Sequence, residues 1–259
     1  AVVGACTAPP PPDGPVPSPA GTSGRTCAPA AVRSCALPYP SDQWTVADRS
    51  TPTGLRLDLP ADLIPASVQS ALGPGAHLED VQAGADGFSA VGPVVFELDR
   101  PVDAASLPAD GGDVVRVFDR ATGEPVPLRV ELTLDSIRQG APDTIVMAWP
   151  QVRWEPGRTY VARLADGLSG PQGAPGRPAG MDDTAGVGGS FISSVRADLA
   201  RIEGDRWDTT LEATRFTVRS TRTATATMDH MVPVARAADH PVRNLTVGPA
   251  LLTPSGSAV

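Results

Sequence analysis

The chain contains no lysine and a single asparagine, Asn244, among its 259 residues. Aromatic residues make up only 4% of it, so a core must be built mainly from Val, Leu, Ala and Ile. No apolar run approaches the roughly 20 residues that a membrane-spanning helix needs. Any membrane attachment is therefore expected to be covalent or to depend on a partner. The formal net charge of −8 argues against a nucleic-acid partner and against electrostatic binding to anionic lipids.

Turn-forming residues are abundant. Gly occurs 26 times and Pro 29 times, while hydrophobic residues make up 41% of the chain. That hydrophobic content is enough for a packed core, and the spread of Gly and Pro favours short strands over long helices. The length allows one large domain or two small ones.

Apolar and polar residues alternate with a period of two along much of the chain, which is typical of half-buried strands. The expected strands are 55–59, 93–98, 114–118, 128–132, 144–149, 159–164 and 211–218. Turn residues separate them at the spacing of a β-sandwich. We therefore predict an all-β, immunoglobulin-like β-sandwich over 27–243, with an irregular N-terminal segment and a tail at 244–259.

One or two short helices are expected within this domain. Ser193 or Ser194 can cap a helix that Gly204 stops, with Val195 and Leu199 on its apolar face. A second short helix is predicted over 222–231, ending before Pro233.

The first six residues end in Val3-Gly4-Ala5-Cys6, which resembles a lipobox, although Leu is usual at the position of Val3. This pattern predicts lipidation at Cys6 and a lipid-anchored protein on the outer face of the bacterial membrane. An ordinary N-terminus of small residues is the alternative. Residues 7–26 are rich in Pro, Gly, Ser and Thr, and together with the lipobox form a 1–26 segment that we interpret as a tether.

The three cysteines divide into a pair and a single residue. Cys27 and Cys35 lie eight positions apart and are predicted to form a disulfide in an exported protein. Cys6 is left as the odd cysteine, which agrees with its predicted lipidation. A metal site at Cys27 and Cys35 is disfavoured because no His lies nearby.

Several segments resemble known families. Phe118–Pro127, together with Leu164–Leu168 after the turn at 156–160, is similar to bacterial Ig-like domains. The segments that resemble the N-terminal region of secreted bacterial lipase-like proteins are Cys35–Asp42, Thr51–Leu57, Asp86–Ser89 and Phe216–Thr221. In that family an α/β-hydrolase domain follows this region, and the resemblance spans roughly residues 27–240.

The use of Arg for every basic residue indicates a GC-rich genome, such as an actinobacterial one; selection for surface Arg is the alternative.

The catalytic signature of that hydrolase domain does not occur in the chain. Its Gly-x-Ser-x-Gly motif is absent, and the nearest strings, 87–90 and 167–170, lack the second Gly in register. His77, His230 and His240 are interpreted as solvated or structural residues, because no acid is placed to orient them. The chain is therefore not expected to be an enzyme, and no cofactor or metal is predicted.

Two acidic loops and four tryptophans are further candidates for binding sites. The loops 110–113 and 181–184 are better explained by turns and caps than by calcium. The four tryptophans are expected to anchor the core, and this role is favoured over that of a binding platform. They are Trp44, Trp149, Trp154 and Trp207. Taken together, these features predict a non-enzymatic cell-surface lipoprotein whose Ig-like domain binds or scaffolds an envelope protein or surface ligand. The alternative is an accessory N-terminal domain of a secreted lipase- or esterase-like hydrolase.

Overall fold

The computed structural model divides the chain into two compact units, residues 1–224 and 225–259. The residues it describes are 27–28, 31–32, 34–60, 63, 84–133, 144–182 and 188–238. The predicted lipidation site at Cys6, the tether and the tail at 244–259 lie outside them.

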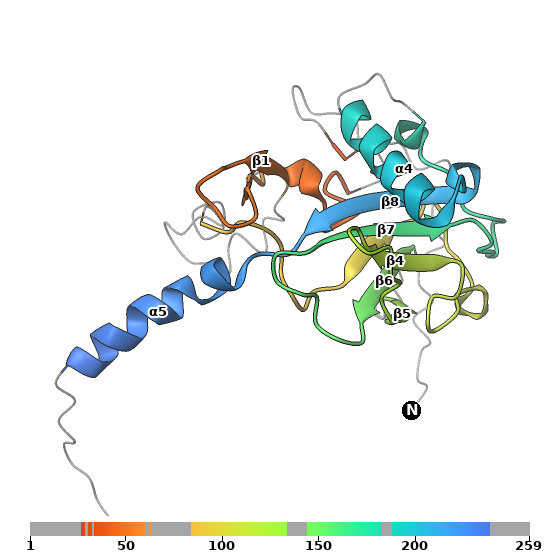
Figure 1. Ribbon diagram of the computed structural model, residues 1–259. Coiled ribbons are helices and arrows are strands. Elements are labelled where there is room, and N and C mark those ends of the chain that lie inside the picture. Colours follow the sequence, from red (N-terminus) through yellow and green to blue (C-terminus); the bar gives the residue numbers. More distant parts are fainter. Residues whose placement is uncertain are drawn as a thin grey trace, which may run out of the picture. The chain divides into compact units, whose positions relative to one another are not determined.

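The first unit contains eight described strands and one long helix (Figure 1). The strands are β1 (Thr45–Ala47), β2 (Leu55–Leu57), β3 (Val94–Glu97), β4 (Val115–Asp119), β5 (Leu128–Leu132), β6 (Ile145–Pro150), β7 (Thr159–Ala165) and β8 (Thr210–Thr217). The helix is α4 (Gly189–Glu203), and the short 3-10 helices are η1 (Asp42–Trp44), η3 (Ala104–Ser106), η4 (Ala179–Met181) and η5 (Trp207–Thr209). The last helix, α5 (Thr221–Ala237), continues into the second unit. The described chain is thus mostly β, as the sequence predicts at the level of class.

All strand pairs are antiparallel. They form a two-stranded sheet, β1-β2, and two three-stranded sheets in the orders β3-β6-β5 and β4-β7-β8. The side chains of β5 alternate between buried and exposed, as its sequence predicts, because only one face of this strand is covered. Every residue of β7 after Thr159 is buried, so both faces of that strand are covered.

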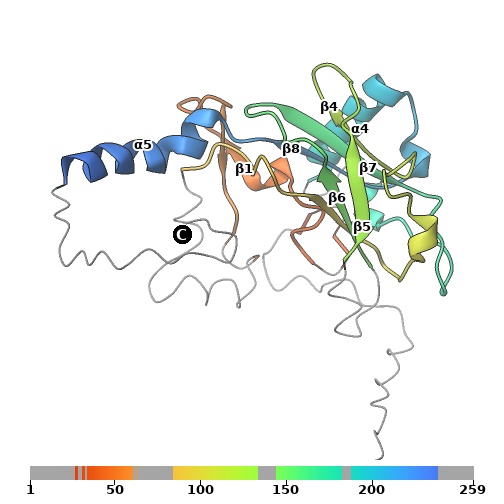
Figure 2. The same cartoon turned by 90° about the horizontal axis from the view of Figure 1, so that it is seen from below.

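The two faces of the β4-β7-β8 sheet pack against different partners. One face shares a single apolar cluster with the β3-β6-β5 sheet, through residues such as Val117, Tyr160 and Phe96. The other face packs against α4, where Phe118 and Val161 lie in a second cluster. Figures 1 and 2 show α4 lying across this sheet. The sheet is therefore a middle layer, which explains why β7 and β8 are buried on both sides.

The structure corrects the predicted start of α4 and the predicted end of α5. Helix α4 begins at Gly189 and not after Ser193 or Ser194, because Gly188 adopts a left-handed conformation at φ 97° and its carbonyl accepts the amide of Ile192. Its predicted end is confirmed, with Gly204 at φ 78° as the C-cap. Helix α5 continues through Pro233 to Ala237. A proline removes one helical hydrogen bond, and here the turn beyond it still forms, with the Ala238 amide bonded to the Val234 carbonyl.

Candidate functional site

Helix α4 is held on its sheet by apolar and charged contacts together. Ile192, Val195 and Leu199 recur at helical spacing and are buried against the sheet. Two acidic residues of α4, Asp198 and Glu203, are also buried, with side chains 7% and 5% exposed. A buried carboxylate is unfavourable unless a positive charge and hydrogen bonds stabilise it. The arginines that surround these two residues therefore anchor the helix.

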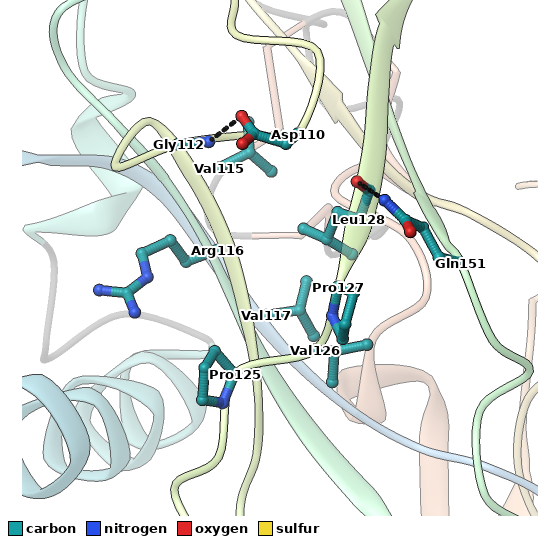
Figure 3. A pocket seen from close by; sticks show the side chains of 10 residues that line it. All are labelled: Asp110, Gly112, Val115, Arg116, Val117, Pro125, Val126, Pro127, Leu128 and Gln151. Carbon is teal, nitrogen blue, oxygen red and sulfur yellow. Dashed lines mark hydrogen bonds between the residues drawn. The ribbon is translucent and has the colours of Figure 1, made fainter.

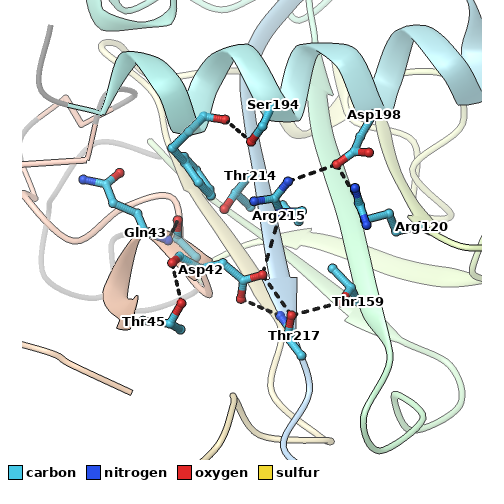
Figure 4. Close-up of polar contacts among 12 residues, drawn as sticks. Asp42, Gln43, Thr45, Arg120, Thr159, Ser194, Asp198, Thr214, Arg215 and Thr217 are labelled. Atoms are coloured by element: carbon cyan, nitrogen blue, oxygen red, sulfur yellow. Dashed lines mark hydrogen bonds and ion pairs between the residues drawn. The ribbon is translucent and has the colours of Figure 1, made fainter. Parts of the chain in front are cut away.

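Asp198 is bound by one arginine that follows β4 and one on β8, the two strands on either side of β7 (Figure 4). Its Oδ2 accepts hydrogen bonds from Arg120 Nε at 2.8 Å and from Arg215 Nη1 at 3.2 Å. Arg120 follows β4 and Arg215 lies on β8, so one carboxylate links the helix to both edges of the sheet.

Arg215 also reaches a third element, the 3-10 helix η1. Its Nε lies 3.8 Å from Asp42 Oδ2. Asp42 accepts hydrogen bonds from the Thr217 amide at 2.7 Å and the Thr217 hydroxyl at 2.9 Å, and that hydroxyl lies 3.0 Å from the Thr159 hydroxyl (Figure 4). Burial raises the pKa of Asp42 to about 6, although the Thr217 hydrogen bonds and the charges of Arg215 and Arg120 act to lower it. We name Asp42, Asp198, Arg120 and Arg215 the four-charge cluster.

A second ion pair fixes the C-terminal end of α4. Glu203 accepts from Arg163 Nε at 2.9 Å and from Arg163 Nη2 at 2.9 Å. Arg116 Nη1 approaches the same carboxylate at 3.5 Å, and its guanidinium stacks over Phe118 at 4.7 Å. The Arg163 side chain is only 2% exposed, so this is a buried, fork-like pair.

Two glutamates are buried where β3 and β8 come together. Glu97 accepts the Ser34 amide at 2.6 Å and the Ser34 hydroxyl at 3.3 Å. Among the described residues, neither oxygen of the Glu212 carboxyl group makes a well-formed hydrogen bond. Burial raises the pKa of Glu212 well above its ordinary value; the backbone N–H of Glu97 opposes this, and the charges of Glu97 and Asp99 add to it. Burial therefore favours the protonated form of Glu212 over the carboxylate.

A cleft of about 300 Å³ lies between the edge strands β4 and β5 (Figure 3). Its lining residues are Asp110, Gly112, Val115, Arg116, Val117, Pro125, Val126, Pro127, Leu128 and Gln151. The Val117 carbonyl accepts the Val126 amide at 2.8 Å, and the Leu128 carbonyl accepts Gln151 Nε2 at 2.9 Å. Among these lining side chains, Arg116 and Gln151 can donate hydrogen bonds to a ligand and Asp110 can accept them.

The segments 86–89 and 216–221 lie side by side in the first unit. Phe88 exchanges backbone hydrogen bonds with this region, donating to the Thr217 carbonyl at 2.8 Å and accepting from Arg219 at 2.9 Å. Asp86 accepts the Ser220 amide at 2.9 Å and also the Thr223 hydroxyl. Burial opposes ionisation of Asp86, but these hydrogen bonds outweigh it and lower its pKa. Asp86 therefore fixes the start of α5.

The structure places some of the sequence-predicted site residues. Cys27 and Cys35 lie at disulfide distance, with sulfurs 1.94 Å apart. His230 is exposed on α5, and His77 and His240 lie outside the described residues.

The predicted acidic loops make turns and ion pairs. Asp110 accepts the Gly112 amide at 3.1 Å, which is the expected turn role. Asp182 pairs with Arg177 at 2.9 Å, while residues 183 and 184 lie outside the described part. Among the described residues no group of three or more His, Cys, Asp or Glu side chains could hold a metal ion.

Three of the four tryptophans are core anchors. Trp44, Trp154 and Trp207 are at most 5% exposed. Trp149 is half-buried and donates its indole N–H to Glu131 at 2.9 Å.

Within the described ranges, no helix is long and apolar enough to cross a membrane. No protein-family model matches the chain, and no curated protein is significantly similar to it in sequence.

Proposed function

We propose that this chain is a non-enzymatic protein of the bacterial cell surface, anchored through lipidated Cys6, whose β domain binds a partner protein or surface ligand. The observation that carries the binding role is the cleft between β4 and β5, which places the polar side chains of Arg116 and Gln151 beside apolar ones such as Leu128. Such an arrangement suits an extended peptide segment, whose carbonyls can accept hydrogen bonds from Arg116 while its apolar side chains enter the cleft.

An immunoglobulin-like sandwich is the fold that fits this role. Two three-stranded antiparallel sheets that share one apolar cluster support it.

The disulfide-distance pair Cys27–Cys35 supports export, because disulfides persist in oxidising compartments. The buried carboxylates of α4 are bound by arginines that tie elements together, which supports a structural role for these charges.

Blocking the cleft tests this proposal. Gln151 lines the cleft and is exposed, so Gln151→Trp should fill the cleft without disturbing the core. The neighbouring Val152 is 63% exposed and does not line the cleft, so Val152→Trp is the matched control. A partner captured from detergent-solubilised envelope should be retained by wild type and the control and lost with Gln151→Trp. Equal capture by all three proteins would contradict binding at the cleft.

The non-enzymatic part of the proposal has its own test. Purified chain should neither hydrolyse short-chain nitrophenyl esters nor react with a fluorophosphonate probe, since acyl transfer needs an activated nucleophile beside an oriented base. Turnover that disappears when one Ser or one His is mutated would overturn this part of the proposal.

A second candidate is an accessory domain of a lipase- or esterase-like hydrolase. The observation that favours it is that two segments resembling that family, 86–89 and 216–221, meet in space through the hydrogen bonds of Phe88 with Thr217 and Arg219. Segments that fold together in this way behave as one structural module. Reading the gene beyond residue 259 distinguishes the two candidates, because a downstream Gly-x-Ser-x-Gly motif in the same frame would favour the accessory role.

A further inference from the structure

Arg116 lies on the wall of the cleft between β4 and β5 with most of its hydrogen-bonding capacity unused (Figure 3). Its side chain is 29% exposed, and its Nη1 lies 3.5 Å from Glu203 and 3.8 Å from Asp113. Both distances are longer than the roughly 2.7–3.2 Å of a hydrogen bond. A guanidinium carries five N–H donors, so Arg116 has donors to offer to a ligand.

The charge of Arg116 is only partly compensated by its neighbours. The carboxylate of Glu203 already accepts two hydrogen bonds of 2.9 Å from Arg163. Two guanidinium groups thus share one buried carboxylate, which leaves one positive charge in excess. The other acid near Arg116, Asp113, has a side chain that is 83% exposed, so water screens its attraction. The excess positive charge favours a ligand that brings a carboxylate.

The guanidinium of Arg116 is also held in place before any ligand arrives. It stacks over the ring of Phe118 at 4.7 Å. Phe118 is 2% exposed and belongs to the apolar cluster under α4, so the ring is a fixed support. A side chain that is already positioned loses less conformational freedom on binding, which raises affinity.

Most of the remaining cleft wall is apolar. Val115, Val117 and Leu128 are at most 3% exposed, and Pro125 and Pro127 lie beside them. The volume of about 300 Å³ is at the lower end of the range for ligand sites. The cleft therefore suits an apolar side chain together with one neighbouring polar group.

We propose that the cleft recognises a carboxylate carried beside an apolar side chain on an extended peptide, and that Arg116 is the residue that binds this carboxylate. The inference rests on the proposed binding role of the cleft and adds the chemistry of its ligand. The carboxylate accepts hydrogen bonds from the guanidinium, and the apolar side chain lies against Val117 and Leu128. Either the C-terminus of the peptide or an Asp or Glu side chain supplies the carboxylate.

The charges of the chain favour a single carboxylate over a polyanion such as a phosphate polymer. The formal net charge of −8 repels a ligand with many negative groups. Asp110 also lines the cleft, where its carboxylate accepts the Gly112 amide at 3.1 Å. A second negative group of the ligand would meet this aspartate, whereas a peptide N–H could donate to it.

The experiment measures binding of three pools of fluorescein-labelled hexapeptides to the full chain by fluorescence anisotropy. All pools are random mixtures of Gly, Ala, Val, Leu and Ser. The first pool has a free C-terminal carboxylate. The second has a C-terminal amide and one internal Asp or Glu, and the third has the amide with Asn or Gln at that position. The first or the second pool should bind at least about tenfold more tightly than the third, a factor that one hydrogen bond to a charged group can supply. The pool that binds more tightly identifies the source of the carboxylate.

Three variants assign the effect to Arg116. Arg116→Gln should reduce binding of the carboxylate pools to the level of the third pool. Arg116→Lys keeps the charge but not the fork of donors, so it should bind with intermediate affinity. Arg129 lies on β5 with a side chain that is 58% exposed and does not line the cleft, so Arg129→Gln is the matched control that should bind as wild type does. Urea unfolding verifies that each variant is folded.

The outcomes separate this proposal from the binding role of the cleft. If the three pools bind equally and Gln151→Trp abolishes their binding, the cleft is a peptide site but carboxylate recognition is wrong. If no pool binds at protein concentrations up to about 1 mM, both proposals are overturned. Inorganic polyphosphate that binds wild type but not Arg116→Gln, while the peptide pools do not bind, would show that the cleft takes a polyanion instead.

Discussion

The carboxylate of Glu203 stands at the last position of α4, where the negative end of the helix dipole disfavours it. Its position is explained by Arg163, whose guanidinium it meets at 2.9 Å and whose side chain is 2% exposed. Replacing Glu203 by Gln removes the charge while keeping the volume. The guanidinium is then left buried without a counter-charge, since Arg116 adds only a further positive group nearby.

The expected cost follows from this geometry. Breaking a buried ion pair by removing one partner costs about 3–5 kcal/mol, and relief at the helix terminus returns about 0.3–1 kcal/mol. We therefore expect Glu203→Gln to lower the free energy of unfolding by about 3 kcal/mol. That is a large part of the roughly 5–15 kcal/mol that a folded domain has in total. With a urea dependence of about 2 kcal/mol per M, the unfolding midpoint should fall by about 1.5 M.

Two comparisons make this prediction decisive. Glu155 pairs with Arg158 at 3.3 Å, but their side chains are 70% and 44% exposed, so Glu155→Gln should cost less than about 0.5 kcal/mol. Replacing both members of the buried pair, by Arg163→Met with Glu203→Leu, should come within about 1 kcal/mol of wild type, because no buried charge remains. A Glu203→Gln cost below about 1 kcal/mol, or a double variant as unstable as the sum of its single changes, would refute the reasoning.

Three further outcomes are expected. The pKa of Asp42 is about 6 in the folded protein and 3.8 in the reference state, so the folded chain retains a proton that the unfolded chain loses as pH rises. The free energy of unfolding should therefore fall by about 3 kcal/mol between roughly pH 4 and 6. Asp42→Asn should remove this fall. Urea unfolding that shows the same pH dependence for both proteins would contradict the prediction. Mass spectrometry of non-reduced peptides should find Cys27 joined to Cys35, whereas two free thiols in native protein would rule the bond out. Cys6→Ala should move the protein from the membrane to the soluble fraction, and a variant that stays on the membrane without accumulating precursor would contradict lipidation.

The strands could be predicted from the sequence because their apolar side chains are buried and the polar side chains between them are exposed. In β5, apolar Leu128 and Val130 face the core, and the intervening Arg129 is exposed, as its pattern indicates. The end of α4 was also predictable, because Gly204 supplies a conformation that other residues rarely adopt. These signals are local, and a local signal needs no knowledge of what packs nearby.

The same alternation of apolar and polar residues gives a wrong expectation for the burial of the residues that anchor α4. Arg163 occupies a polar position between apolar neighbours in β7, a pattern that indicates a solvent-facing side chain. In the structure α4 covers that face of the sheet, and Arg163 is buried against Glu203. A signal was present in the helix itself, because Asp198 immediately precedes the buried Leu199 and shares the apolar side with it. An acid on the buried side of a helix predicts a basic partner, but the sequence does not say which strand supplies it.

The four-charge cluster depends on contacts across almost the whole first unit. Asp42 and Thr217 are 175 positions apart, and their hydrogen bonds form only when η1 meets the end of β8. The cleft is equally non-local, since it exists because β4 and β5 are the facing edges of two different sheets. Neither the pairing of strands nor their edge positions can be predicted from residue patterns within each strand.

At two buried positions, arginine has a structural role that lysine could not fill. Arg215 uses Nε toward Asp42 and Nη1 toward Asp198, so one planar side chain joins η1, β8 and α4. Arg163 likewise meets Glu203 through two different nitrogens. A lysine ammonium is a single point charge and cannot present two donors in a fixed plane to separate carboxylates. Genome composition can account for arginine at exposed sites such as Arg129, where either basic residue would serve. At these buried sites, the packing of α4 on the sheet itself requires the guanidinium.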